Sequence, residues 1–397
     1  MLNETMLGLG TKRSAIRELF EYGRQRKALL GEDKVFDFSI GNPSVPTPQR
    51  FTETLTELIQ TTDPVALHGY TSAQGDLSVR KAIAEAETAR TGMESDPNLI
   101  YMTCGAAASL TVSLHAICNP GDEIIVLAPY FPEYRVFVEK AGAVLKEVSC
   151  LPHTFRIDFE ALAKAISPKT KGLIVNSPNN PTGAVIPEED LAKLGNLLRQ
   201  KEAEFGTEIF IICDEPYRAL TYGDVKVGYI PAFYQRTLVC YSYSKALSLP
   251  GERIGYIAVP PVMPDAPMVY GAICGAGRAL GFVCAPSLMQ YAVAKCPDAV
   301  ADLSVYEENR KTLLNALTEM GYAVTPPDGA FYLFVQALEE DAAAFCERAK
   351  EFELLLVPSD SFGVKGYIRI CYCVSAKQIQ NALPAFKALY ESYRKKD

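Results

Sequence analysis

Five short apolar runs, each ending in turn residues, constrain the fold of this chain more than any other feature. They are EIIVLAPY, KGLIVNSPNNPTG, EIFIICDEPY, TLVCYSYSK and IGYIAVPP. Helical segments lie between several of them, such as PEEDLAKLGNLLRQKEAEF, whose leucines share one face. Nearly continuous apolar strands that alternate with helices are typical of a mostly parallel sheet covered on both sides. We therefore predict an α/β fold.

Polar side chains gather where these strands should end. Asn180, Asp214, Tyr217 and Lys245 each follow an apolar run. Ligands of such sheets bind beyond the carboxyl ends of the strands. We therefore expect these four side chains to face one active site.

A phosphate group is one ligand that this region could bind. In MTCGAAASLTVSLHAI, Gly105, Ala106 and Ala107 open a predicted helix whose free N–H groups favour a phosphate, although a plain helix start is the alternative. Further donors could come from Ser242, Ser244 and Arg253. No strand is followed by G-x-G-x-x-G, and G-x-x-x-x-G-K-[ST] does not occur, which disfavours a dinucleotide or P-loop site.

Asp214 and Lys245 indicate which phosphate compound would fit. Asp214 ends the apolar run IFIICD, where a carboxylate is costly unless a cation pairs with it; a solvated strand end is the alternative. A protonated pyridine nitrogen would be a suitable cation. Lys245 supplies an amine whose pKa would be lowered by burial and nearby cations, so that it can form an imine. Lysine, aspartate and a phosphate-binding turn together predict a site for pyridoxal 5′-phosphate.

Composition argues against several other functions. The formal net charge of −8 disfavours binding to nucleic acid or to an anionic membrane. No apolar run approaches the length of a membrane span, and the first residues lack the apolar block of a signal peptide, so we expect a cytoplasmic protein. The eleven cysteines show no C-x-x-C and the three histidines no ligand-like spacing, so we expect neither disulfides nor a metal site.

From about Phe36 onward the chain resembles the class I and II aminotransferases, the fold type I enzymes typified by aspartate aminotransferase. NSPNNPTG and SYSKALSLPGERIGY carry the resemblance, together with CDEPY, YIRICY and GYTSAQGDLSVRKAIA. The resemblance implies a large pyridoxal-phosphate-binding domain at residues 46–282 with a mixed, mostly parallel sheet. It also implies a smaller α+β domain made of residues 1–45 and 283–397.

The resemblance assigns roles to single residues. Lys245 matches the lysine that forms the internal aldimine and moves the substrate's α-proton, and Asp214 matches the residue that keeps the pyridine nitrogen protonated. Arg369 matches the arginine that binds the substrate's α-carboxylate. The other matches are to ring contacts (Phe131, Asn180, Tyr217), to phosphate contacts (Gly105, Ala106, Ala107, Ser242, Ser244, Arg253, and Tyr70 from a second subunit) and to the substrate's backbone donor (Gly41).

These matches predict a homodimeric aminotransferase that moves an α-amino group between an amino acid and a 2-oxo acid, with glutamate and 2-oxoglutarate as one pair. Ala107 stands where one bacterial subgroup has a lysine that reads the substrate's second carboxylate. Arg278, in GAGRALGFVCAPS, is therefore a candidate for that role, on a loop that would reach the partner's site; an interface arginine is the alternative. We also expect Ile16, Leu19 and Phe20, on one face of a helix, to pack on the partner subunit.

Two other functions remain open. A cystathionine β-lyase-type enzyme of the same fold would begin with the same proton abstraction and then eliminate from the β-carbon. A pyridoxal-phosphate-binding transcription regulator would need an added helix-turn-helix domain, for which the roughly 35 residues before VFDFSIGNPS are too few. The acidic net charge also disfavours the regulator.

Overall fold

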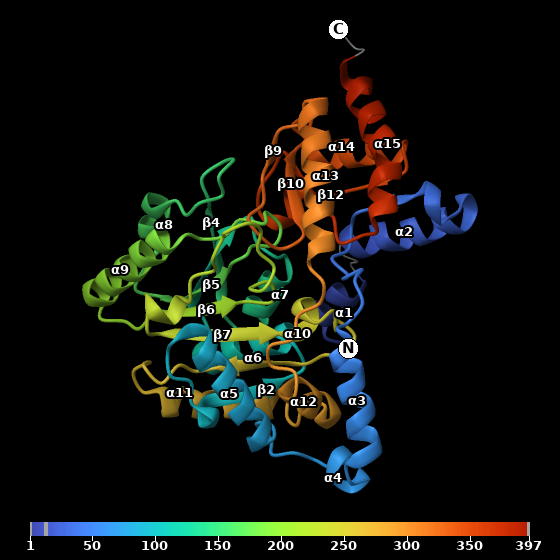
Figure 1. Cartoon of the computed structure of the whole chain (residues 1–397). Coiled ribbons are helices and arrows are strands. Elements are labelled where there is room, and N and C mark those ends of the chain that lie inside the picture. The colour runs from blue at the N-terminus through green and yellow to red at the C-terminus, as the bar shows by residue number, and fades with distance from the viewer. Residues whose placement is uncertain (1, 12–14, 395–397) are drawn as a thin grey trace.

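The computed structural model describes residues 2–11 and 15–394 (Figure 1). Its largest element is a sheet formed by β2 (Ile100–Thr103), β3 (Glu123–Ala128), β4 (Val144–Ser149), β5 (Thr170–Asn176), β6 (Phe210–Asp214), β7 (Thr237–Ser242) and β8 (Gly255–Ala258). The strand order is β2-β8-β7-β6-β5-β3-β4. β8 is antiparallel to both of its neighbours and the other pairs are parallel. This mixed, mostly parallel sheet confirms the predicted fold class.

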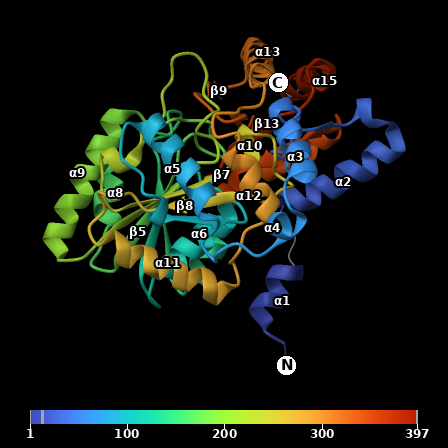
Figure 2. The same ribbon diagram turned by 60° about the horizontal axis from the view of Figure 1, so that its bottom comes forward.

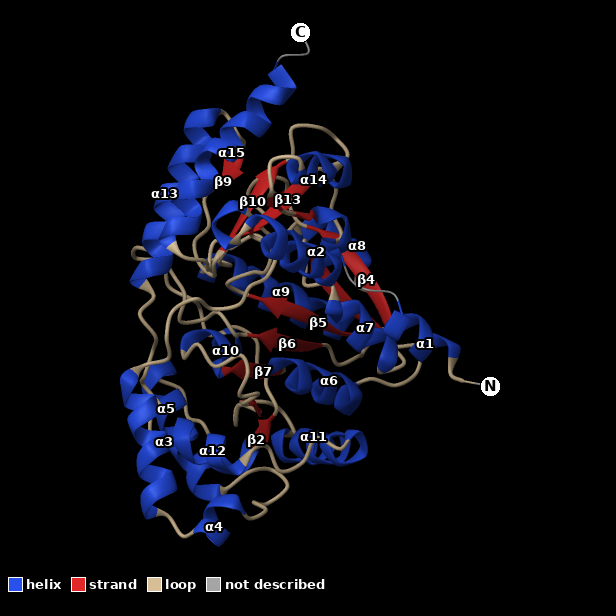
Figure 3. Ribbon diagram, turned by 90° about the vertical axis from the view of Figure 1, so that its right-hand side faces the viewer, coloured by secondary structure: helices blue, strands red, loops and turns tan. Residues whose placement is uncertain are grey.

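Helices cover both faces of the sheet, because alternate residues of each buried strand point to opposite sides (Figure 3). Ile124 and Ile212 face one side, whereas Ile125 and Ile211 face the other. On the first side pack α6 (Ala106–Ile117), α7 (Glu133–Lys140) and α11 (Ala266–Leu280). On the second side lie α3 (Gln49–Thr61), α4 (Pro64–His68), α5 (Leu77–Thr91), α8 (Phe159–Ala165), α9 (Glu188–Phe205) and α12 (Ser287–Ala294).

The C-terminal part of the chain forms a smaller antiparallel sheet. Its strands lie in the order β12 (Val357–Pro358), β13 (Tyr367–Cys371), β10 (Tyr332–Gln336) and β9 (Val324–Thr325). The helices that pack with it are α13 (Ser304–Met320), α14 (Ala342–Lys350) and α15 (Ala376–Arg394). β1 (Phe36–Asp37) pairs with β11 (Leu354–Leu355), which ties the N-terminal segment to this part.

Two helices, α1 (Glu4–Thr11) and α2 (Ala15–Leu30), open the chain. Leu19 of α2 is buried with Val357 and Phe362 of the smaller part. The prediction that Leu19 packs on a partner subunit is therefore wrong, because its own chain buries it. Phe20 is 43% exposed, and α1, which stands apart from the body in Figure 2, has no buried residue.

The division of the chain at residues 282 and 283 stays a prediction. α12 lies beyond that point, yet it packs against α3 and α5 beside the large sheet. Within the described ranges, no helix combines the length and the apolar character that a membrane crossing requires.

Candidate active site

The predicted site residues meet at the carboxyl ends of the central strands. Asp214 is the last residue of β6 and lies opposite Asn176, the last residue of β5. β7 ends at Ser242 and leads directly into the one-turn helix α10 (Tyr243–Ala246), which carries Lys245. A cavity of about 420 Å³ opens at this edge of the sheet.

Most of the predicted residues line this cavity. They are Gly41, Ala106, Ala107, Phe131, Asn180, Asp214, Tyr217, Ser242, Ser244, Lys245, Arg253 and Arg369. Gly105 comes directly before them at the start of α6. Tyr70 and Arg278 lie outside the cavity of their own chain.

Lys245 has the environment of a reactive amine. Its Nζ donates a hydrogen bond to the carbonyl oxygen of Gly41 at 2.7 Å and lies 5.4 Å from the ring centre of Phe331. Burial lowers the pKa of Lys245, and the positive charges of Arg369 and Arg253 act in the same direction. The neutral amine, which can act as a nucleophile or a base, is therefore more accessible here than in an exposed lysine.

Asp214 is a buried carboxylate with only one oxygen satisfied. The Tyr134 hydroxyl donates to its Oδ2 at 2.6 Å, whereas its buried Oδ1 has no hydrogen-bond partner among the described residues. Burial raises the pKa of Asp214 to about 7; the hydrogen bond from Tyr134 lowers it, and the charge of Glu215 raises it. A cationic N–H group in the cavity could pair with Oδ1 and stabilise the charged form.

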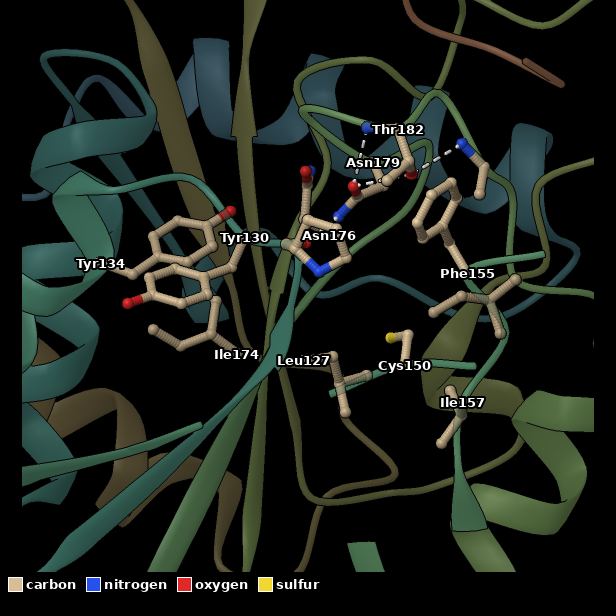
Figure 4. Close-up of a pocket in the computed structure, with 13 residues that line it drawn as sticks. Leu127, Tyr130, Tyr134, Cys150, Phe155, Ile157, Ile174, Asn176, Asn179 and Thr182 are labelled. Atoms are coloured by element: carbon tan, nitrogen blue, oxygen red, sulfur yellow. Dashed lines mark hydrogen bonds between the residues drawn. The ribbon is translucent and has the colours of Figure 1, made fainter. Parts of the chain in front are cut away.

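Aromatic neighbours hold Tyr134 in place. Its ring stacks on Tyr130 with centroids 6.4 Å apart and meets Phe131 edge-on at 5.6 Å. Figure 4 shows a second, smaller cavity of about 30 Å³, lined by Tyr130, Tyr134 and Asn176 among others. Tyr134 and Asn176 line both cavities. Packing of the ring thus directs the Tyr134 hydroxyl at Asp214.

The turn before α6 lies beside Arg253, which contacts Ser244 just after the end of β7. Gly105 has a φ of +88°, which glycine adopts readily, and a Cβ built on it would lie 2.8 Å from Nη2 of Arg253. The Ser242 and Ser244 hydroxyls are 2.7 Å apart, and Nη1 of Arg253 donates to Oγ of Ser244 at 3.4 Å. A helix N-terminus, two hydroxyls and a guanidinium suit a phosphate.

Arg369 is a buried cation on β13. Its Nη1 donates to Oδ1 of Asn180 at 3.1 Å, and its Nη2 donates to the carbonyl oxygen of Ser39. Its guanidinium lies 4.9 Å from the ring centre of Tyr332, and its Nε has no hydrogen-bond partner within the described ranges. A guanidinium so held can bind a carboxylate through two parallel hydrogen bonds.

Tyr217 presents a phenol to the cavity. Its hydroxyl is 2.8 Å from that of Tyr332, and burial raises its pKa, so the phenol stays protonated. It can therefore donate a hydrogen bond. The specific acceptor predicted for it, an oxygen of the cofactor ring, stays a prediction.

Tyr70 and Arg278 are exposed and do not line the cavity of their own chain. The Tyr70 side chain is 98% exposed, and Arg278 is exposed on α11. The loop predicted around Arg278 is wrong: the segment is helical to Leu280, because Ile273 and Ala276 bury one face of α11 despite the helix cost of its glycines. The roles of Tyr70 and Arg278 across a subunit interface stay predictions.

Several lining residues have no predicted role in the site, among them Arg17, Tyr134 and Asn176. Asn176 ends the apolar part of KGLIVNSPNNPTG, so the strand-end argument could have identified it. Tyr134 follows Phe131 by three residues in APYFPEY, a spacing that places both on one side of a helical turn. Arg17 has no such signal, because its helix is remote in sequence from the predicted site residues.

Comparison with known proteins gives one consistent family. The model for aminotransferase class I and II matches residues 33–386. An amino transferase from Eubacterium rectale, a solved structure, is 53% identical with a TM-score of 0.97, and 99% of each chain is covered. The aspartate aminotransferase from Thermus thermophilus with maleate is 27% identical with a TM-score of 0.86, covering 98% of this chain and 99% of that one. Aromatic-amino-acid aminotransferase 2 of Thermococcus litoralis is 28% identical over 93% of this chain and 94% of its own length.

Proposed function

Because this chain belongs to the class I and II aminotransferases and is itself an aminotransferase, we propose that it binds pyridoxal 5′-phosphate in the 420 Å³ cavity and uses glutamate and 2-oxoglutarate as one substrate pair. The observation that carries this proposal is the buried Asp214 carboxylate, whose Oδ1 lacks a partner in the described part of the chain. Such an oxygen needs a cation, and the protonated nitrogen of a pyridine ring supplies one.

The other lining residues fit the rest of the cofactor. Lys245 has the amine that would attach the cofactor's aldehyde. The N-terminus of α6, with Ser242, Ser244 and Arg253, would hold its phosphate. When bound, pyridoxal phosphate supplies an electron sink for the negative charge that develops at the substrate's α-carbon.

The residues of the chain would then divide the work of proton transfer. Nζ of Lys245 takes the proton from the substrate's α-carbon, and its lowered pKa keeps a larger share of the amine neutral for that step. Asp214 holds a proton on the pyridine nitrogen through Oδ1. Tyr134 holds Asp214 in the orientation that this contact requires.

Arg369 would bind the substrate's α-carboxylate. We expect Arg369→Leu to raise KM for every amino-acid substrate by about 10- to 100-fold, the cost of losing charged hydrogen bonds. Arg369→Lys keeps the positive charge but lacks the planar guanidinium. Its KM should therefore lie between those of the wild type and Arg369→Leu. Steady-state kinetics on proteins with equal cofactor content measures this, and an unchanged KM in Arg369→Leu would show that another residue binds the carboxylate.

The contact between Tyr134 and Asp214 should affect how cofactor affinity depends on pH. The hydrogen bond from Tyr134 lowers the pKa of Asp214, so Tyr134→Phe should raise it above about 7. A protonated Asp214 cannot pair with a cation, so cofactor affinity should fall as the pH falls through the pKa of Asp214.

In Tyr134→Phe the loss of cofactor affinity should begin about one pH unit higher than in the wild type. A shift of that size is expected when one charged hydrogen bond is lost. Titration of the apoprotein with pyridoxal phosphate from pH 6 to 9 measures the shift, and the cofactor's own ionisations are the same for both proteins. Superimposed pH curves would mean that Tyr134 does not act on Asp214.

We also propose that the protein is a homodimer in which Tyr70 reaches the phosphate site of the partner subunit. The near-complete exposure of Tyr70 in one chain supports this, because a tyrosine ring is usually partly buried. Sedimentation of the holoprotein gives the oligomeric state. If the protein is a monomer at micromolar concentration and active there, both parts of the proposal fail.

An amino-transfer assay with glutamate as donor tests the proposed substrate pair. The protein, loaded with pyridoxal phosphate, is given glutamate with a series of aliphatic, aromatic and acidic 2-oxo acids, and amino-acid products are separated by chromatography. We expect at least one new amino acid to form together with an equal amount of 2-oxoglutarate. Failure of glutamate with every acceptor, while alanine or an aromatic amino acid serves as donor, would overturn the proposed substrate pair.

A further inference from the structure

The proposed function assigns a ligand group to every cation of the cavity lining except one. Among its described lining residues the cations are Arg17, Lys245, Arg253 and Arg369, and the anions are Glu133 and Asp214. In the proposed function Lys245, Arg253 and Arg369 serve the cofactor's aldehyde, its phosphate and the substrate's α-carboxylate. Arg17 is the cation that these groups do not use.

α2 fixes the position of Arg17 at the cavity. Leu19, two residues on, is buried in the smaller part of the chain, and Arg26 forms an ion pair with Glu353 further along the same helix. A Cβ built on Gly23 would lie 2.6 Å from Cδ1 of Leu355, so the helix approaches β11 closely. With α2 anchored in this way, its first turn brings Ile16 and Arg17 to the cavity wall.

Part of the cavity lining suits the side chain of a substrate. The apolar residues of the lining include Ile16, Ile40, Leu110, Phe131 and Phe137. Such a wall accommodates methylene groups or an aromatic ring, and a charged end beyond them needs a partner of opposite charge. Arg17 can supply it, because a guanidinium pairs with a carboxylate through two hydrogen bonds.

We propose that Arg17 binds the second carboxylate of dicarboxylic substrates such as glutamate and 2-oxoglutarate, and so sets the preference between acidic and neutral substrates. This inference rests on the proposed function and adds the residue that reads the substrate's side chain. Ala107 cannot do so, because its methyl group carries no charge. Arg278 is exposed on α11 outside the cavity of its own chain and could act only in a partner's site.

The test compares two substrate classes in holoprotein variants. Arg17→Ala should lower kcat/KM for glutamate and 2-oxoglutarate by about 10- to 100-fold, as for the loss of a charged hydrogen-bonded pair, and should weaken binding of the unreactive dicarboxylate glutarate by a similar factor. The kcat/KM values for alanine and phenylalanine should change far less. Arg17→Lys, which keeps the charge, should recover part of the loss.

Arg24→Ala is the matched control, because Arg24 is exposed on the same helix and does not line the cavity. It should resemble the wild type with both substrate classes. Equal losses on acidic and neutral substrates in Arg17→Ala would overturn the inference, since they would mean that Arg17 only positions α2. A selective loss of acidic substrates in Arg278→Ala, with none in Arg17→Ala, would also overturn it.

Measurements on the wild-type protein show whether the proposed function or only the role of Arg17 has failed. If it neither turns over glutamate nor binds glutarate, the proposed substrate pair and the role of Arg17 both fail. If it uses glutamate well and Arg17→Ala does so equally, the proposed function stands and the inference alone fails.

Discussion

Replacing Lys245 by alanine is expected to lower the rate of amino transfer by about four orders of magnitude or more, because both the covalent link and the base are lost. Lys245 is the only lysine among the described residues that line the cavity, so no neighbouring amine can replace it. Turnover with glutamate and a 2-oxo acid measures the loss. Borohydride reduction followed by peptide mass analysis should find the cofactor attached to Lys245 in the wild type and to no residue in the variant.

Lys245→Arg is the matched control for charge. Its guanidinium can still donate a hydrogen bond to the carbonyl oxygen of Gly41, but it cannot form the covalent link. It should therefore be as inactive as Lys245→Ala. A Lys245→Ala protein that retains a rate within about tenfold of the wild type would contradict the assignment, since general base catalysis alone contributes more than that.

Replacing Asp214 by asparagine is expected to slow removal of the substrate's α-proton by about three orders of magnitude. Asparagine keeps the size of the side chain and can still accept from Tyr134, but it has no charge to hold a protonated pyridine nitrogen. The measurement is the rate at which the α-hydrogen of glutamate exchanges with deuterium of the solvent.

Cofactor content must be matched for that comparison, because Asp214→Asn should also bind pyridoxal phosphate more weakly. Asp214→Glu, which restores the charge at a different position, should exchange faster than Asp214→Asn. If Asp214→Asn exchanges at the wild-type rate when saturated with cofactor, the carboxylate is only a buried strand end.

Elements that are encoded by a local run of apolar residues could be predicted from the sequence. The five apolar runs became β3, β5, β6, β7 and β8, because buried strands need continuous apolar residues. Two strands of the same sheet lacked that signal. β4 is a half-exposed edge strand with the sequence VLKEVS, and β2 has only four residues.

Contacts between segments far apart in the sequence were the part that could not be predicted. The hydrogen bond from Tyr134 to Asp214 joins residues 80 positions apart and depends on how α7 packs against the sheet. Leu19 has the same apolar character whether it packs on its own chain or on a partner, so its pattern could not decide between them. Arg17 reaches the cavity only because α2 docks on the smaller part of the chain.

The most direct test of amino transfer by this protein is a half-reaction with one amino acid and no acceptor. Protein saturated with pyridoxal phosphate and freed of excess cofactor is mixed with glutamate, and the cofactor's absorbance and the products are followed together. We predict that one equivalent of 2-oxoglutarate forms per active site, that the cofactor is converted to its pyridoxamine form, and that the reaction then stops until a 2-oxo acid is added. Continued release of ammonia and pyruvate from cystathionine, with no conversion of the cofactor by any amino acid, would show that the protein is a lyase instead.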